Sequence, residues 1–229
     1  NDSISAFSLS LSNPTFARVF SNTFKTEFSD AFIHISIDVS GSMSGDKFDQ
    51  AMVSAVAVAK ACSMIEGIDV KITLRTTTNE HTYGQCLPFI LNAYDSRKDS
   101  IQKIKSMFWM LQSSGTTPEG LCFEAIMKNF LPSNNDMDSY FLNISDGEPY
   151  FGNSDLYYSG YTAFDHTRKM VKMIEGMGIK TLSYFVDDWG RDGEPSEGFK
   201  RMYGKGAKKI DVTNIAQITK TMNQLFLTK

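Results

Sequence analysis

The sequence predicts a doubly wound α/β fold, in which a mostly parallel six-stranded sheet with one antiparallel edge strand carries helices on both faces. Three observations support this prediction. From residue 31 onward, short apolar runs of strand length alternate with longer segments whose apolar residues recur at helical spacing. One gap between two strands is too short for a helical crossover, which requires an antiparallel pair. The chain has 229 residues, of which 41% are hydrophobic, enough for one large domain with a single core.

The first three elements form one βαβ unit. Residues 32–39 are predicted to be a buried strand, and residues 70–76 a second strand. Between them, apolar residues at helical spacing predict a helix over residues 47–66. A helical crossover of this kind makes the two strands parallel.

The third strand is predicted at the edge of the sheet. It lies within residues 86–94, only about ten residues after the second strand, and so forms an antiparallel hairpin with it. The remaining segments continue the alternation of helices and strands. The predicted helices are residues 100–111, 118–130, 164–176, 197–203 and 214–226, and the predicted strands are residues 140–145, 180–186 and 208–212.

The chain divides into an N-terminal flanking segment, residues 1–30, and an α/β domain, residues 31–229. In the flank, a phenylalanine recurs every four residues from Phe16 to Phe28, which places these rings along one side of a helix if the segment is helical. We interpret the flank as an ordered segment laid on the core.

Composition disfavours several classes of function. With 23 Lys and Arg against 26 Asp and Glu, the formal net charge is −3, which gives no field to hold nucleic acid or an anionic membrane surface. The longest apolar run, residues 51–65, is too short to span a bilayer and is interrupted by Lys60. The three cysteines are too few for a disulfide framework and too far apart for a zinc knot, which is typical of a reduced, cytoplasmic setting.

A group of oxygen ligands is predicted where the strands end. Asp38, Ser40 and Ser42 follow the first strand on a glycine-containing turn. The loop 115–118 can add a threonine hydroxyl, and Asp146, just after a strongly hydrophobic strand, can add a second carboxylate. In doubly wound sheets, ligands bind beyond the carboxyl ends of the strands. Carboxylates combined with hydroxyls suit Mg²⁺, which prefers about six oxygen ligands and retains water readily.

This arrangement resembles the metal-ion-dependent adhesion site (MIDAS) of von Willebrand factor A (vWA) domains, which have a Rossmann-like fold. Their pattern of Asp-x-Ser-x-Ser, then a Thr, then an Asp occurs here in the same order, and the likeness covers about residues 31–228. The resemblance implies a bound divalent cation, Mg²⁺ or else Mn²⁺ or Ca²⁺. It also implies ligand roles, in which one threonine binds the cation directly together with Ser40 and Ser42, while Asp38 and Asp146 bind it directly or through water.

Two threonines are candidates for the third hydroxyl. Family members that read Gly-Thr-Pro here imply Thr117, whereas those in which the ligand follows the glycine at once imply Thr116. Pro118 at the first helical position would make Thr117 the N-cap of the next helix. We therefore favour Thr117 and keep Thr116 as the alternative.

No catalytic residue is predicted, and we expect the chain not to be an enzyme. A haloacid-dehalogenase-like phosphatase needs a second Asp two residues after the first, where this chain has Ser40. The segment 41–45 has Met43 where a nucleophile elbow has its serine. Residues 45–47 lack the Gly-Lys-Ser/Thr run of a phosphate loop.

A cation held in this way keeps an open coordination position, which a carboxylate of another protein can fill. We therefore expect a partner protein that presents an Asp or Glu, and neither nucleic acid nor a membrane. Because aromatic side chains anchor many interfaces, four aromatics after Asp146 are predicted to bind this partner. They are Tyr150, Phe151, Tyr157 and Tyr158. The alternative is that these side chains fold over the domain's own helices.

A second, looser resemblance is to the C-terminal domain of the cobalt-chelatase T subunit and its bacterial and phage relatives. It is carried by residues 155–175, 182–188 and 211–225. This resemblance implies a cytoplasmic, non-catalytic adaptor that works with a ring ATPase of the MoxR or chelatase type, the ATPase or its substrate supplying the carboxylate. The alternative function is an extracellular adhesion module, although such domains usually come with disulfides.

Overall fold

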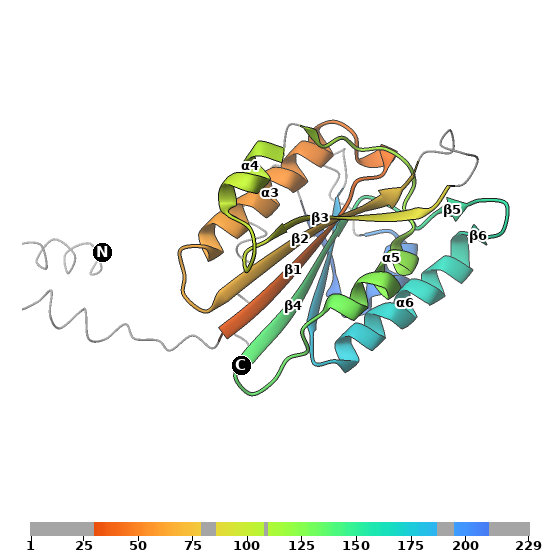
Figure 1. Cartoon of the computed structure of the whole chain (residues 1–229). Coiled ribbons are helices and arrows are strands. Elements are labelled where there is room, and N and C mark those ends of the chain that lie inside the picture. The colour runs from red at the N-terminus through yellow and green to blue at the C-terminus, as the bar shows by residue number, and fades with distance from the viewer. Residues whose placement is uncertain (1–29, 79–85, 108–109, 187–194, 211–229) are drawn as a thin grey trace, which may run out of the picture.

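The computed structural model describes residues 30–78, 86–107, 110–186 and 195–210. Two predicted features lie outside these residues: the phenylalanine-bearing flank before residue 30 and the closing helix at residues 214–226. The described residues contain a six-stranded sheet with strand order β3-β2-β1-β4-β7-β8 (Figure 1). All neighbouring strands are parallel except β2 and β3, which are antiparallel. The predicted fold class is confirmed.

The observed elements follow the predicted order, with most bounds shifted by one to four residues. The strands of this sheet are β1 (Asp30–Asp38), β2 (Ile68–Thr77), β3 (Pro88–Asp95), β4 (Met137–Ser145), β7 (Lys180–Val186) and β8 (Ala207–Ile210). The helices are α3 (Asp46–Cys62), α4 (Ile101–Met107), α5 (Glu119–Ile126), α6 (Gly160–Gly176) and α7 (Glu197–Tyr203), with 3-10 turns at Gly41–Met43, Met127–Asn129 and Gly204–Gly206.

Two local features differ from the prediction. The helix expected over residues 118–130 is shorter, because α5 ends at Ile126 and tightens into the 3-10 turn Met127–Asn129. A small antiparallel hairpin, β5 (Phe151–Gly152) with β6 (Tyr157–Tyr158), was not predicted. Strands of two residues are too short to show the alternation by which longer strands are recognised.

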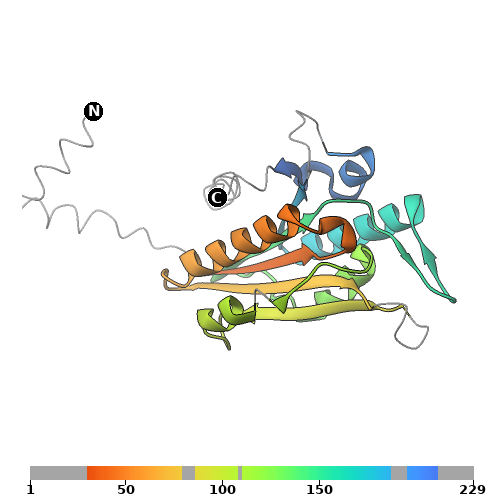
Figure 2. The same cartoon turned by 90° about the horizontal axis from the view of Figure 1, so that it is seen from above.

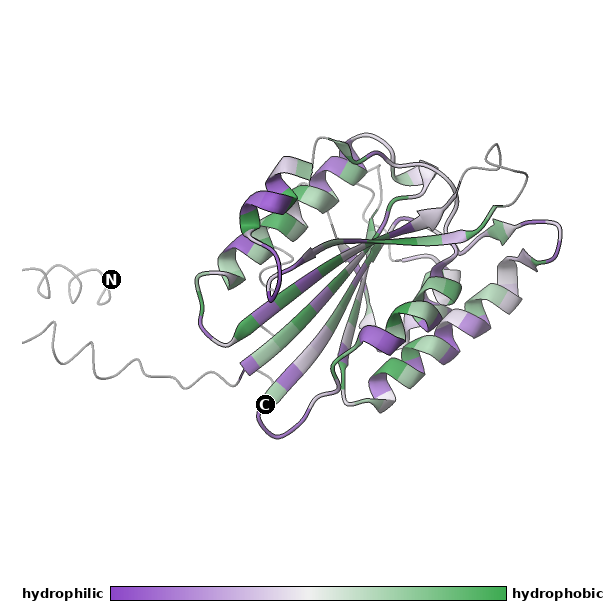
Figure 3. Ribbon diagram, in the orientation of Figure 1, coloured by the Kyte–Doolittle hydropathy of each residue, from purple (hydrophilic) through white to green (hydrophobic). Residues whose placement is uncertain are grey.

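Helices cover both faces of the sheet and divide the core in two. Helices α3 and α4 lie on one face and α5 and α6 on the other (Figures 1 and 2). The first half of the core joins α3 and Ile104 of α4 to the sheet, and the second joins α5, α6 and α7 to Phe141 of β4. Apolar residues recur on α3 and α6 between hydrophilic ones, as one-sided burial requires (Figure 3).

The central strand β1 has different chemistry on its two faces. Ile33, Ile35 and Ile37 belong to the core half that contains α3. Successive side chains point to opposite faces of a strand, so His34, Ser36 and Asp38 face the side of α5 and α6. All three of these polar residues are buried. They form a polar column that ends at the carboxyl end of the strand.

His34 is a structural member of this column. Its Nε2 lies 2.9 Å from Thr73 Oγ1, and its ring packs edge-on against Phe130 and Phe141 at centroid distances of 4.9 Å and 5.7 Å. Burial, aided by the positive charge of Lys71, lowers the pKa of His34 from 6.5 to about 3. The ring is therefore neutral in the folded protein at neutral pH.

The folded-state pKa of His34 lies below its unfolded value, so between pH 6.5 and 3 the unfolded chain binds the proton more tightly. The contribution of neutral His34 to the free energy of unfolding is fully present above pH 6.5 and is lost as the pH falls toward 3. Below pH 6, we expect the free energy of unfolding of wild type to fall by about 1 kcal/mol more per pH unit than that of His34→Gln. Urea unfolding of both proteins at pH 7, 6 and 5 measures this difference; parallel stability curves would contradict it.

Candidate metal centre

The candidate site lies at the carboxyl ends of β1 and β4, which are parallel neighbours. Ile37 pairs with Ile144, so the next residues, Asp38 and Ser145, end their strands side by side. Asp38 is fully buried, at 0% exposure. The exposed residue Ser42 lies in the outer part of the site, so only that part reaches solvent.

Both oxygens of Asp38 accept hydrogen bonds. Its Oδ1 accepts from the backbone N–H of Ser40 at 2.9 Å. Its Oδ2 accepts from Thr117 Oγ1 at 3.2 Å and from Ser145 Oγ at 2.8 Å. Ser145 was not predicted as a site residue, although its place directly before Asp146 was a signal. Asp38 is thus held by three separate segments of the chain.

The outer part of the site continues from Ser40 to Asp146. Ser40 Oγ lies 3.0 Å from Ser42 Oγ, and Ser42 Oγ donates to Asp146 Oδ1 at 2.9 Å. The structure therefore brings together the predicted residues Asp38, Ser40, Ser42, Thr117 and Asp146.

Of the two candidate threonines, Thr117 is the one in contact with Asp38. Thr116 Oγ1 instead lies 3.3 Å from Thr77 Oγ1. The expected N-cap role of Thr117 is wrong, because α5 begins at Glu119, its N-cap residue is Pro118, and no side chain caps it. The hydroxyl of Thr117 therefore donates to Asp38 and does not cap α5.

Backbone contacts fix the loops that carry these side chains. The N–H of Gly41 donates to the carbonyl of Gly115 at 3.0 Å, and the N–H of Ser114 donates to the carbonyl of Val39 at 2.8 Å. Gly115 has φ 78°, and a Cβ there would lie 2.7 Å from the carbonyl oxygen of Thr77. Only glycine allows the loop to approach the end of β2 this closely.

These residues fit a hard cation. All of the side-chain donors are oxygens, and two of them are carboxylates. Mg²⁺ binds oxygens in an octahedron at about 2.1 Å, which places neighbouring ligands about 3.0 Å apart. The Ser40–Ser42 and Ser42–Asp146 contacts of 3.0 Å and 2.9 Å are hydrogen bonds, which hold these oxygens close enough together to bind one cation. Mg²⁺ and the similar Mn²⁺ fit better than Ca²⁺, which takes more oxygens at longer distance.

Below Asp38 lies an ion pair between Arg75 of β2 and Glu119 of α5. Arg75 Nη2 lies 2.6 Å from Glu119 Oε1, and the two side chains are 1% and 0% exposed. The pair was not predicted, because residues 44 positions apart give no local pattern. Burial raises the pKa of Glu119, and the charge of Arg75 opposes that rise.

The ion pair connects several elements beneath the site. Arg75 also donates from Nη1 to Ser36 Oγ at 3.1 Å and from Nη2 to the carbonyl of Ile144 at 3.3 Å. Asn143 Nδ2 donates to Glu119 Oε1 at 3.0 Å and to the hydroxyl of Tyr203 at 2.9 Å. This buried network therefore joins β1, β2, β4, α5 and α7.

The four predicted partner-binding aromatics divide into two pairs. Tyr150 and Tyr157 are 46% and 70% exposed, with ring centroids 6.0 Å apart in an edge-on arrangement. Phe151 and Tyr158 are only 2% and 4% exposed, so the prediction that they bind a partner is wrong. They pack with Cys86 under the hairpin instead. Side chains alternate along each short strand, so one aromatic of each strand faces inward.

The hairpin is attached to the site. The N–H of Tyr150 donates to the carbonyl of Thr117 at 2.9 Å. At its other end, the hydroxyl of Tyr158 lies 3.0 Å from His166 Nδ1 and 3.2 Å from Thr167 Oγ1 of α6. In Figures 1 and 2 the β5–β6 hairpin projects beyond the end of the sheet where β1 ends. Tyr150 is thus close in the fold to Thr117, and its ring lies beside that of Tyr157.

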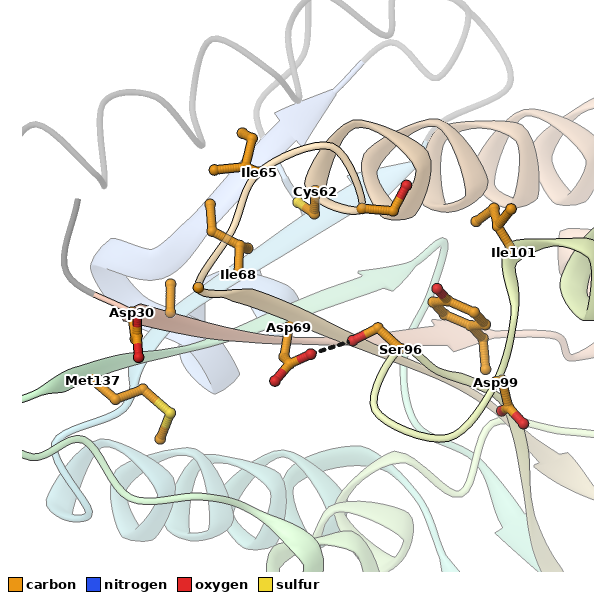
Figure 4. Close-up of a pocket in the computed structure, with 13 residues that line it drawn as sticks. Asp30, Cys62, Ile65, Ile68, Asp69, Ser96, Asp99, Ile101 and Met137 are labelled. Carbon is orange, nitrogen blue, oxygen red and sulfur yellow. Dashed lines mark hydrogen bonds between the residues drawn. The ribbon is translucent and has the colours of Figure 1, made fainter. Parts of the chain in front are cut away.

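A pocket of about 470 Å³ lies at the opposite end of the sheet, where β1 and β2 begin (Figure 4). Its lining includes Asp30, Asp69 and Asp99, and Ser96 Oγ donates to Asp69 Oδ1 at 2.6 Å. Within the described part of the chain, no group of three or more His, Cys, Asp or Glu residues could hold a metal ion. The mixed hydroxyl and carboxylate cluster around Asp38 is therefore the cation site to test.

Comparisons with known proteins agree with this architecture. No family model and no curated protein matches the chain. Among solved structures, the vWF domain of the type V pili tip protein Mfa5 from Porphyromonas gingivalis gives a TM-score of 0.59 at 11% identity, over 88% of this chain and 98% of that one. The pilus adhesin SpaC from Lactobacillus rhamnosus GG gives 0.56 at 9% identity, over 86% of this chain and 30% of the adhesin. Manganese-loaded TRAP protein from Plasmodium vivax gives 0.53 at 14% identity, over 83% and 72%.

The chain is a doubly wound α/β domain with an oxygen-lined cluster at the carboxyl ends of its strands. Its fold is vWA-like, as these structures show and as the sequence predicted. None of the helices within the described residues combines the length and the apolar character that a membrane crossing requires.

The Arg75–Glu119 pair gives a stability prediction. Arg75→Met should lower the free energy of unfolding by about 3–5 kcal/mol, because it leaves the Glu119 carboxylate buried without the guanidinium that pairs with it. Adding Glu119→Gln should recover part of this loss, since the neutral amide is less costly to bury. Urea unfolding of the two single variants and the double variant measures the coupling; additive losses would show that the two side chains act independently.

The Asp38 cluster gives a metal-binding prediction. The protein should bind Mn²⁺, and Asp38→Asn should weaken that binding at least about tenfold, because it removes one of two carboxylates from the site. Asn is preferred to Ala because an Ala would leave three buried donors without an acceptor, at about 1–3 kcal/mol. Isothermal titration calorimetry is the measurement, with Asp49→Asn on the exposed side of α3 as the control. Equal affinities of wild type and Asp38→Asn would show that the site is wrongly assigned.

Proposed function

We propose that this chain is a divalent-cation-dependent interaction module of the adhesion type, which binds a carboxylate of another protein at the Asp38 cluster. One observation carries the proposal. Five predicted oxygen ligands, from three separate segments of the chain, meet at the carboxyl end of a vWA-like sheet. The proposal includes no catalytic role.

The residues of the cluster have different tasks in this proposal. Asp38, which is fully buried, supplies fixed negative charge at the base and orients the hydroxyls of Thr117 and Ser145. Ser42 is exposed and marks the side from which a partner approaches. A bound Mg²⁺ or Mn²⁺ supplies the positive charge that a partner's carboxylate needs. With two carboxylates and a few hydroxyls around it, such a cation retains positions for water or an incoming ligand.

The exposed tyrosines extend the proposed surface. Tyr150, which contacts Thr117, and the neighbouring Tyr157 are amphipathic and exposed, and such side chains supply large contact areas with few rotatable bonds. A partner whose acid reaches the Asp38 cluster can pack its neighbouring residues on these rings. The combination of a central charged contact and flanking aromatic contacts is typical of strong interface sites.

Adhesion is favoured over the ATPase adaptor that the looser resemblance implied. The similar structures described above are a pilus tip protein, a pilus adhesin and a manganese-loaded TRAP protein. Carried over to this chain, these likenesses support a role in attachment outside the cell. An adaptor of a ring ATPase in the cytoplasm is the less supported candidate.

The cysteines are compatible with an extracellular setting. Cys62, Cys86 and Cys122 are free and buried. Burial raises the pKa of Cys62 to about 11 and that of Cys122 to about 12, so their reactive thiolates are scarce at neutral pH. Thiols protected in this way survive oxidising conditions better than exposed ones. Their presence therefore does not require the reduced compartment expected from the cysteine count.

Peptide display tests the proposed docking. Selection of a random peptide library on the protein in Mn²⁺ should enrich peptides that contain Asp or Glu, and EDTA should release them. In a selected peptide, replacing the acid by its amide should cost about 2–4 kcal/mol of binding, and Tyr157→Ala in the protein about 2 kcal/mol. Met64 is an apolar residue beyond the far end of α3 and is 76% exposed, and Met64→Ala should leave peptide binding unchanged.

Two outcomes would contradict the proposal. Selected peptides without acids, or acidic peptides retained equally in EDTA and by Asp38→Asn, would exclude docking through a cation. The location of the protein in its native host distinguishes an adhesion module from a cytoplasmic adaptor. Protease added to intact cells of the native host should digest the protein if it is an adhesion module and leave it intact if it is a cytoplasmic adaptor.

A further inference from the structure

The positively charged side chain of Lys47 lies at the outer part of the Asp38 cluster, next to Asp146. Lys47 is the second residue of α3, directly after the loop that carries Ser40 and Ser42. Its Nζ lies 2.5 Å from Asp146 Oδ2, while Ser42 Oγ occupies the other oxygen of the same carboxylate. One of the two carboxylates of the site is therefore already paired with a positive charge.

This ion pair is shielded from water. The side chains of Lys47 and Asp146 are 11% and 2% exposed. Charges in such a place interact more strongly than on the open surface, because little solvent screens them. Lysine side chains are almost never buried unless they are paired, and Asp146 is a partner of the Lys47 ammonium. The pair is consequently part of the site rather than a surface contact beside it.

The ammonium changes the charge of the site. Counting the described residues named above, Asp38 and Asp146 together contribute two negative charges, and Lys47 reduces the sum to one. The Arg75–Glu119 pair below contains one charge of each sign and leaves this balance unchanged. Without Lys47, the two carboxylates would repel each other across Ser40 and Ser42. Lys47 therefore takes over, in the metal-free protein, part of the charge balance that a divalent cation would provide.

We propose that Lys47 is an internal competitor of the divalent cation, which stabilises the metal-free site and lowers its affinity for metal. This inference rests on the proposed function, since it concerns the same cluster. A divalent cation gains the full charge of Asp146 only by displacing the ammonium or by sharing the carboxylate with it. Removal of Lys47 should therefore increase metal affinity and decrease the stability of the metal-free protein. If Lys47 only held Asp146 in place for the metal, its removal would decrease affinity.

Metal titration distinguishes these two roles. Lys47→Met keeps the length and apolar stem of the side chain and removes its charge. We expect it to bind Mn²⁺ more tightly than wild type, on the order of tenfold to a hundredfold, which is the size of a lost repulsion between neighbouring charges in partly screened surroundings. Lys47→Arg keeps the charge and should bind Mn²⁺ no more tightly than wild type. Lys60→Met, at an exposed position in the last turn of the same helix, is the matched control and should equal wild type.

Two further measurements separate charge from packing. Without metal, Lys47→Met should unfold at a lower temperature than wild type, and saturating Mn²⁺ should reduce that difference. In an Asp146→Asn background the gain from Lys47→Met should largely disappear, because the carboxylate for which the two cations compete is gone. Both readouts measure the metal-free and metal-bound protein directly and need no partner.

Each outcome decides the question. Tighter Mn²⁺ binding by Lys47→Met, unchanged binding by Lys60→Met and dependence on Asp146 support the inference. If wild type binds Mn²⁺ and the folded Lys47→Met variant binds it equally or more weakly, the inference is wrong while the metal site stands. If Lys47→Arg also binds Mn²⁺ more tightly than wild type, the effect comes from packing rather than charge, and the inference is wrong. If neither wild type nor Lys47→Met binds Mn²⁺, the proposed metal site fails and the inference fails with it.

Discussion

The buried ion pair between Arg75 and Glu119 is the interaction on which the arrangement at the end of the sheet depends. It is almost inaccessible to solvent and lies where β1, β2, β4 and α5 meet. Such a pair adds little net stability, because desolvation of two charges offsets most of their attraction. Its effect is on geometry. Once both groups are buried, any arrangement that separates them is costly, so β2 and the start of α5 keep one relative position.

The Asp38 cluster depends on that position. Thr117 lies two residues before Glu119, and Asp38 pairs with Arg75 in the register of β1 and β2. Holding Glu119 against Arg75 therefore places the threonine hydroxyl over the carboxylate of Asp38. The same loop accepts the N–H of Tyr150, so the hairpin that carries the exposed tyrosines is aligned with the cluster as well. A small set of buried contacts thus connects the interior to the surface that we propose for binding.

The Asp38 cluster also shows how the chain balances its own charges where acidic side chains gather. Acidic groups gathered at one place repel each other, and the cost increases where water is excluded. Asp38 is surrounded by an N–H and two hydroxyl donors, and Asp146 is paired with Lys47. The metal-free state is consequently well satisfied.

The sequence by itself determined the order of the elements, the mixed sheet and the residue types of the site. These features depend on local spacing: strand-length apolar runs, a gap too short for a crossover, and oxygen side chains immediately after Asp38 and Ser145. Only the tertiary structure showed that Thr117 rather than Thr116 contacts Asp38, separated Tyr157 from the buried Phe151, and revealed partners of Lys47 and Arg75. Each of those outcomes depends on which segments pack together across many residues. The sequence favoured Thr117 because a proline follows it, but only the position of the Asp38 carboxylate shows which of the two neighbouring hydroxyls contacts it.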